Sequence, residues 1–118
     1  MNSLLIDDLR VPGDALNKKN IPADAVVARN YADGIKLLQA GCHGKPFDVL
    51  YLDHDLADFS GPEGREMTGY DILCWLEEFP QYLPQENIII VSDNSSGMLR
   101  MRQVINKLYG REIGRAHV

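Results

Sequence analysis

The sequence has no long apolar run, no charged-then-apolar leader and no excess of positive charge. None of its apolar stretches approaches the roughly 20 residues of a membrane-spanning helix, so we expect no membrane span and a cytoplasmic location. The 12 Lys and Arg residues are outnumbered by 17 Asp and Glu residues, and the formal net charge is -5 at pH 7. An extended nucleic-acid surface is therefore not expected, although a small phosphate ligand or an RNA end bound through a metal remains compatible with this charge.

The sequence also has only two cysteines, and it shows no sign of a boundary between domains. Cys42 and Cys74 lie far apart in no CxxC or zinc-ligand spacing, so we expect reduced thiols. There is no internal repeat, low-complexity segment or linker, and residues 1–112 are expected to form one domain. Residues 113–118 can be translated from ATC GGA AGA GCA CAC GTC, which resembles the start of a widely used sequencing adapter. We expect a non-native tail there that conceals the natural C-terminus.

Four short apolar segments predict the strands of a buried parallel sheet. They lie at residues 4–6, 25–28, 47–50 and 87–91. Residues 14–24 are polar and contain Pro22, which predicts a short or irregular crossover between the first two strands.

Helix-capping residues predict three helices among these strands. Asn30 caps a first helix that ends at Gly41, and Thr68 with Asp71 has the spacing of a capping box for a second. A third is expected to begin near Ser95. Strands alternating with helices predict an α/β fold with three layers, an open parallel sheet of about four strands covered by helices.

Three of the predicted strands end in ionisable or hydrogen-bonding residues. The groups are Asp7-Asp8, Asp53-His54-Asp55 and Ser92-Asp93-Asn94. The ligand crevice of an open parallel sheet lies outside the carboxyl ends of its strands, so these groups converge if the first, third and fourth strands are neighbours. Converging carboxylates need a cation, and oxygen ligands suit Mg²⁺ or Mn²⁺ better than zinc. The serine, the asparagine and the amides that open the last helix are suited to phosphate oxygens.

Each of these groups also has a purely structural interpretation. The acidic pair can be turn residues, and the Ser-Asp-Asn stretch can cap the last helix, but three such ends on one edge favour a site. Strand alternation places His54 on the face opposite Asp53, so a supporting or structural histidine fits the pattern as well as a chemical role does. Arg10 can contact a phosphate, face solvent or pair with a carboxylate.

The spacing of these residues resembles that of response-regulator receiver domains, which have a flavodoxin-like fold. In that family an acidic pair and a phospho-acceptor Asp bind Mg²⁺, and a Ser or Thr contacts the phosphoryl group. The sequence departs from that pattern in two ways: no fifth strand delivers a lysine, and His54-Asp55-Leu56 follows the acceptor in place of a Met-Pro type turn.

A closer resemblance is to the receiver-derived family called cyclic-phosphate processing receiver domains. It covers nearly the whole chain up to Tyr109, and its LDHDL and TGYD stretches are fairly specific together. A histidine is expected immediately before the serine of the last strand, where this sequence has Val91. The matching stretches are Ile6-Asp7-Asp8-Leu9-Arg10 with Pro12, Ala28-Arg29-Asn30, Leu52-Asp53-His54-Asp55-Leu56, Thr68-Gly69-Tyr70-Asp71 with Trp75, and Ser92 with Asn94 and Gly97.

This second resemblance implies a divalent-metal-dependent phosphoesterase that processes a cyclic or terminal phosphate of RNA or a nucleotide, such as a 2′,3′-cyclic RNA end. Mg²⁺ or Mn²⁺ would neutralise phosphate oxygens, and a general acid or base would assist. The implied metal ligands are Asp7, Asp8 and Asp53. The implied catalytic residues are Asp53, His54 and Asp55. The implied phosphate-binding residues are Ser92, Asn94 and Arg10.

Two rival functions remain. One is a non-catalytic pseudo-receiver that binds a protein partner, for instance as a phage-encoded inhibitor, and Val91 and the missing lysine favour it. The other is an aspartyl-phosphate switch at Asp53, which has the least support.

Overall fold

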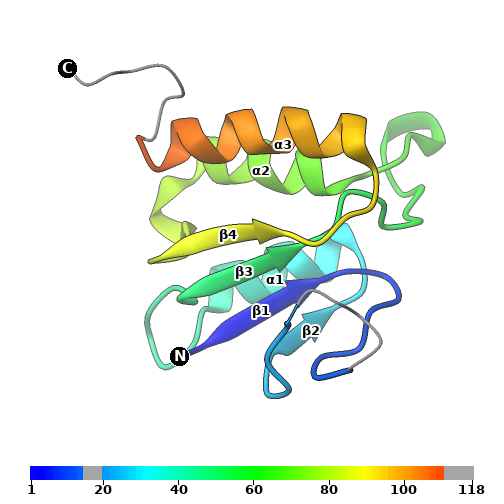
Figure 1. The fold of residues 1–118 in the computed structure, drawn as a ribbon. Coiled ribbons are helices and arrows are strands. Elements are labelled where there is room, and N and C mark those ends of the chain that lie inside the picture. Colours follow the sequence, from blue (N-terminus) through cyan, green and yellow to red (C-terminus); the bar gives the residue numbers. More distant parts are fainter. Residues whose placement is uncertain (15–19, 111–118) are drawn as a thin grey trace.

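The computed structural model describes residues 1–14 and 20–110, and its elements follow the predicted order (Figure 1). The expected tail at 113–118 and part of the expected crossover at 14–24 lie outside the described residues. The strands are β1 (Ser3–Ile6), β2 (Val26–Ala28), β3 (Val49–Leu52) and β4 (Asn87–Ile90). The helices are α1 (Tyr31–Ala40), α2 (Gly69–Glu78) and α3 (Ser95–Leu108), with short 3-10 turns at Pro62–Gly64 (η1) and Pro80–Tyr82 (η2).

The four strands are all parallel, in the order β2-β1-β3-β4. The register pairs Ile6 with Ala28 and with Leu52, and Leu52 with Ile90, so the strands end at one level. Polar residues that follow β1, β3 and β4 therefore emerge next to one another. This order confirms the α/β class and the open parallel sheet, and in the described part of the chain no fifth strand lies beside β4.

The beginning of each helix is set by a side-chain cap. Asn30 accepts a hydrogen bond from a first-turn amide of α1, and Asn94 does the same for α3. Thr68 and Asp71 form the complete capping box of α2. Because caps act within a few residues, all three predicted helix starts agree with the structure. None of the helices in the described residues is both long and apolar enough to cross a membrane.

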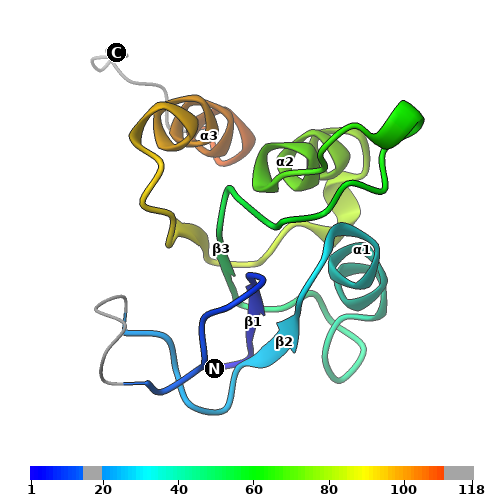
Figure 2. The same cartoon turned by 90° about the vertical axis from the view of Figure 1, so that its right-hand side faces the viewer.

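The helices lie in a row on one face of the sheet, with α2 packed between α1 and α3 (Figure 2). The main hydrophobic core, with Leu4, Leu50 and Met101 at its centre, fills the space between this row and the sheet. On the other face lies the connection between β1 and β2, whose Ile21 packs with Leu5 and Val91. The third layer is thus formed by the described parts of this connection, whereas the prediction was a sheet covered by helices.

The strand boundaries differ from the predicted ones by one or two residues. β3 begins at Val49 because its pairing with both neighbours begins there, opposite Ser3 of β1 and Asn87 of β4. Asp48, just before it, accepts a hydrogen bond from the Asn2 amide through its carboxylate at 2.8 Å. The strand then continues to Leu52, so Asp53 is the first residue after it. The edge strands are apolar but only partly buried, since Val26 on β2 is 40% exposed and Ile89 on β4 is 36% exposed.

Candidate metal and phosphate site

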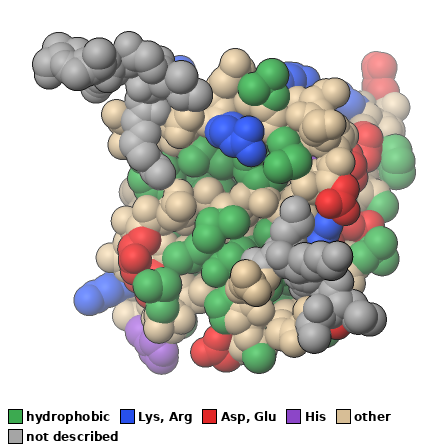
Figure 3. All heavy atoms as spheres, in the orientation of Figure 1, with side chains coloured by type: hydrophobic (Ala, Val, Ile, Leu, Met, Phe, Trp, Pro, Cys, Tyr) green, Lys and Arg blue, Asp and Glu red, His purple; other side chains and the backbone are tan. Residues whose placement is uncertain are grey.

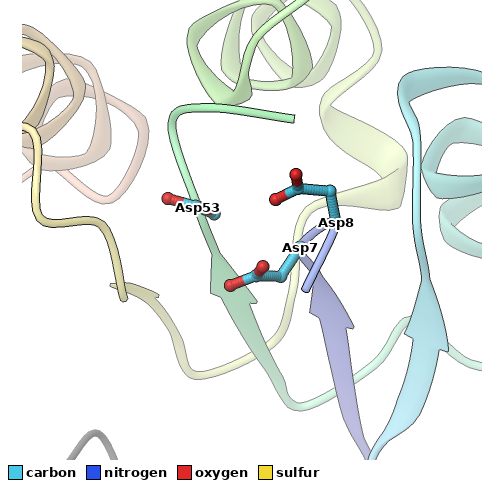
Figure 4. A group of neighbouring side chains, drawn as sticks. All are labelled: Asp7, Asp8 and Asp53. Atoms are coloured by element: carbon cyan, nitrogen blue, oxygen red, sulfur yellow. The ribbon is translucent and has the colours of Figure 1, made fainter. Parts of the chain in front are cut away.

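Three carboxylates meet at the carboxyl edge of the sheet (Figure 4). Asp7 and Asp8 follow β1, Asp53 follows the neighbouring β3, and one oxygen of each lies within 4.8 Å of the others. Asp7 is fully buried and Asp53 is 6% exposed, so water screens their charges poorly. The three residues predicted as metal ligands thus occupy one place, which we call the acidic cluster.

The acidic cluster is electrostatically crowded. Two unit charges about 4.8 Å apart repel by about 3 kcal/mol at an effective dielectric constant of about 20. Burial and the charge of Asp7 together raise the pKa of Asp53 from 3.8 to about 6, against the opposing effects of Arg10, the His54 amide and the Ser92 hydroxyl. A cation placed among these oxygens would relieve the repulsion.

Arg10 provides a cation from within the chain. Its Nη1 lies 2.8 Å from Asp7 Oδ2 and 3.5 Å from Asp53 Oδ2, and its Nη2 lies 3.1 Å from Asp93 Oδ2. Of the three alternatives for this side chain, the structure has the carboxylate-paired one. Its guanidinium therefore contacts two of the three carboxylates that a metal ion would need.

Two further residues support this arrangement, and the sequence patterns gave them no role. Arg29 Nη1 donates to the backbone carbonyls of Asp7, at 3.2 Å, and Arg10, at 2.6 Å, and so fixes the turn that follows β1. Asp93, whose side chain is 86% exposed, is the outer partner of Arg10. Arg29 belongs to a stretch that carries the family resemblance, but its carbonyl partners are 22 and 19 residues away, and no local spacing reveals them.

Ser92 and Asn94 lie between the acidic cluster and the first turn of α3. Ser92 is buried, its hydroxyl accepts a hydrogen bond from the Asn94 amide at 3.0 Å, and it also hydrogen-bonds with Asp53. Asn94 accepts from the Gly97 amide at 2.9 Å. The exposed amides of Ser95 and Ser96 donate to no acceptor in the described part of the chain. A helix N-terminus with unused amides favours an anion.

His54 lies beside the acidic cluster, against the first turn of α3. Its Nδ1 is 2.8 Å from Asp55 Oδ1 and 3.4 Å from Asn94 Nδ2. A carboxylate can only accept, so a hydrogen bond from Nδ1 to Asp55 requires a proton on Nδ1. The ring packs so closely on Gly97 that a Cβ added there would lie 2.5 Å from Cδ2. The His54 backbone amide donates to Asp53 Oδ1 at 2.8 Å.

Val91 occupies the position at which the resemblance led us to expect a histidine. Its side chain is fully buried in the small cluster with Leu5 and Ile21, on the face of the sheet that carries no helix. This position therefore contributes packing to the protein, and His54 is the histidine that lies near the acidic cluster.

The donor set fits a hard divalent cation. Three carboxylate oxygens within 4.8 Å of one another can share one ion, and the guanidinium already paired with two of them indicates that positive charge is stabilised there. Such oxygen ligands are typical of Mg²⁺ and Mn²⁺, while zinc sites are rich in His and Cys.

The fold and this site define a receiver-like domain, in which an acidic pair after β1, an aspartate after β3 and a serine after β4 share one edge of a parallel sheet. The sequence profile of the Cyclic-phosphate processing Receiver domain matches residues 2–107, and the chain belongs to this family. The family name links the domain to the processing of cyclic phosphates. No curated protein and no solved structure matches the chain.

Proposed function

We propose that the protein is a divalent-metal-dependent phosphoesterase that hydrolyses a cyclic or terminal phosphate at an RNA end or on a nucleotide. Residues 1–112 would form the functional domain, acting in the cytoplasm. The observation that carries the proposal is the acidic cluster of Asp7, Asp8 and Asp53, with oxygens within 4.8 Å of one another. The family match supports the same chemistry.

In this proposal, different residues at the site bind the metal ion and the phosphate. Asp7, Asp8 and Asp53 would hold Mg²⁺ or Mn²⁺, which when bound neutralises charge on the phosphate oxygens. The phosphate would lie at the first turn of α3, where Ser92, Asn94 and two exposed backbone amides offer hydrogen-bonding groups. Arg10, released from its carboxylate partners, would be a second positive contact for the phosphate.

Hydrolysis of a cyclic phosphate consumes one water molecule. A bond forms between phosphorus and the water oxygen, a bond between phosphorus and one ribose oxygen breaks, and a proton passes from the water to the released hydroxyl. His54 is the candidate for moving this proton, since a neutral ring that donates from Nδ1 to Asp55, at 2.8 Å, has Nε2 as its basic nitrogen. Asp55 thereby orients the base.

Product analysis tests the proposal directly. The purified protein would be incubated with Mg²⁺ or Mn²⁺ and an oligonucleotide that ends in a 2′,3′-cyclic phosphate, and the products identified by mass. We expect a mass gain of one water, abolished by EDTA and by Asp53→Ala. His54→Asn should lower the rate by about 100-fold or more, a typical effect of removing a general base. Absence of turnover with every divalent metal would overturn the proposal.

Matched variants separate chemistry from folding. Asp24 and His43 are exposed residues away from the acidic cluster, so Asp24→Asn and His43→Asn should keep full activity. Mg²⁺ should raise the melting temperature of the parent and leave that of Asp7→Asn unchanged, because a ligand that binds only the folded state stabilises it. If Mg²⁺ raises the melting temperature of the parent but no turnover is found, the metal site is supported and the enzymatic function is wrong.

A second candidate function is binding of a protein partner without catalysis. Two observations favour it: Val91 replaces the expected histidine, and apolar side chains gather over the helix-free face of the sheet (Figure 3). Ile89 is the most exposed of the apolar residues on β4. A pulled-down partner whose binding is lost in Ile89→Lys but unchanged in Asp53→Ala would support this function over the first.

A further inference from the structure

A pocket lies beside the acidic cluster, on the side away from α3. It has a volume of about 680 Å³ and is lined by Asp8, by residues at the beginning of α1 and by the chain that follows β3. Asp8 belongs to both the pocket and the acidic cluster. The volume is within the range of small-molecule sites, and the shared Asp8 makes the pocket and the cluster neighbours.

The lining of this pocket does not suit a phosphate. Three carboxylates, those of Asp8, Asp33 and Asp58, face a single cation, Arg29. Arg29 Nη1 is already bonded to two backbone carbonyls. The first amides of α1 are also occupied, since Tyr31 donates to Asp58 at 2.9 Å and Asp33 donates to the Asn30 side chain at 2.9 Å. The anion-binding end of the site is therefore at α3, and the pocket is left for an uncharged group.

The remaining lining of the pocket has the character of a base-binding surface. Phe59 is 64% exposed, although it is a large aromatic residue, and Leu56 and Ala57 add apolar surface next to it. An exposed ring can stack on any nucleobase, because every base has a flat π face. Asp33 already accepts a hydrogen bond from the Asn30 side chain, and Asp58 from the Tyr31 and Ser60 amides. Because each carboxylate has about four lone-pair sites, both can still accept amino or hydroxyl hydrogens of a nucleoside.

We propose that this pocket binds the nucleoside of the terminal nucleotide, with its base on Phe59, while the phosphate lies toward the first turn of α3. The inference rests on the proposed function, because the substrate's phosphate is assigned to the acidic cluster. It adds the substrate class and its orientation: a nucleoside phosphate lying across the sheet from the α1 side to the α3 side. A sugar phosphate without a base would fill only part of the site.

Binding measurements test this orientation without requiring turnover. Dissociation constants of adenosine 3′-phosphate and of ribose 5-phosphate would be measured by calorimetry on the full chain with Mg²⁺. We expect the nucleotide to bind about 5- to 20-fold more tightly, the lower part of the range for stacking on one aromatic side chain. Phe59→Ala should remove this preference, and Phe59→Trp should retain it.

Two controls locate the effect. Leu99 is 58% exposed on α3, so Leu99→Ala removes a comparable exposed apolar side chain outside the pocket and should keep the preference. In ¹H–¹⁵N spectra, adenosine alone should shift the amides of Ala57 and Ser60 rather than those of Ser95 and Ser96.

The result that would overturn the inference is equal binding of the two ligands, absent binding of both, or a preference that Phe59→Ala leaves intact. Failure of the proposed function looks different. If the protein prefers the nucleotide through Phe59 but never hydrolyses a cyclic phosphate, the nucleoside pocket is supported and the proposed function is wrong. If it hydrolyses the cyclic phosphate without a preference for the nucleotide, the proposed function is supported and the nucleoside pocket is wrong.

Discussion

At the scale of single residues, Arg10 has two opposing relations to the site. It neutralises Asp7 and Asp53 directly, at 2.8 and 3.5 Å, and so competes with any metal ion for the same oxygens. In the proposed function it would also contact the phosphate once a metal ion neutralises the carboxylates. One substitution should therefore change affinity for metal and for phosphate in opposite directions.

Arg10→Gln is expected to tighten Mg²⁺ binding by about 5- to 10-fold, because removing the internal cation leaves more negative charge for the metal. The same change should weaken binding of a phosphate ligand in the presence of saturating Mg²⁺. Calorimetric titrations with each ligand measure both effects. Arg102→Gln on the exposed face of α3 removes the same charge elsewhere and should alter neither affinity by more than about 2-fold. Weaker Mg²⁺ binding in Arg10→Gln would show that the arginine supports the metal site.

Asp53 makes the free energy of unfolding of the metal-free protein depend on pH. A carboxyl whose pKa rises from 3.8 to about 6 on folding disfavours the folded state at high pH, by at most about 3 kcal/mol at about 1.4 kcal/mol per pKa unit. The penalty is complete above pH 6, decreases as the pH falls through the interval between the two values, and vanishes below 3.8. Its contribution to the free energy of unfolding therefore increases as the pH falls.

Asp53→Asn should accordingly be more stable than the parent in EDTA at pH 7.5, by about 1–3 kcal/mol. The difference should fall by about half at pH 5, because the parent carboxyl is then mostly protonated when folded. Urea unfolding of both proteins at the two pH values provides the measurement, with Asp24→Asn as the control for loss of an exposed carboxylate. A variant less stable than the parent at pH 7.5 would contradict the raised pKa.

At the scale of elements, sequence reasoning succeeded where the cause is local. Asn30, Thr68 and Asn94 cap helices that begin one residue later, and a cap and its amide lie within three residues. Strand ends moved by one or two residues because pairing with a neighbour decides them, as at Asp48. The same holds for the site. The three aspartates could be grouped from the sequence because each follows a predicted strand, whereas the partners of Arg10 and Arg29 are known only from the folded structure.

Gly97 of α3 packs directly against the ring of His54, and no space for a side chain remains between them. Gly97→Ala would place a Cβ 2.5 Å from His54 Cδ2 and 2.8 Å from Nε2, so the ring or the helix must move. We expect a loss of about 1–3 kcal/mol in the free energy of unfolding, as for other overpacked sites, and altered His54 ring signals in NMR spectra.

Ser96→Ala in the same turn is the matched control, because Ser96 is exposed whereas Gly97 is buried. It should leave the His54 signals in place. If Gly97→Ala were instead stabilised, as alanine normally stabilises a helix interior, with unmoved His54 signals, the close packing described here would be wrong.

At the scale of the whole molecule, charge limits how much of an RNA the protein can hold. With 17 acidic and 12 basic residues it has no surplus of positive charge with which to follow a phosphate backbone. The proposed site takes the end of a chain, and its recognition should stop within a nucleotide or two of that end.

Extending a cyclic-phosphate-ended RNA from 2 to about 20 nucleotides should therefore change kcat/KM by less than about 3-fold. The measurement is a length series at fixed ionic strength, repeated at higher salt, where a backbone-binding enzyme would lose affinity steeply. A progressive gain with length, lost in high salt, would reveal a nucleic-acid surface that the overall charge does not predict.

The internal guanidinium of Arg10 also bears on the stability of the acidic cluster without a metal ion. A buried carboxylate that has lost its only compensating charge strongly destabilises a folded protein. Arg10 supplies such a charge from within the chain, at 2.8 Å from Asp7 and 3.5 Å from Asp53. In the proposed metal site, binding and release of the ion would therefore exchange one cation for another, and the fold would not depend on the ion concentration.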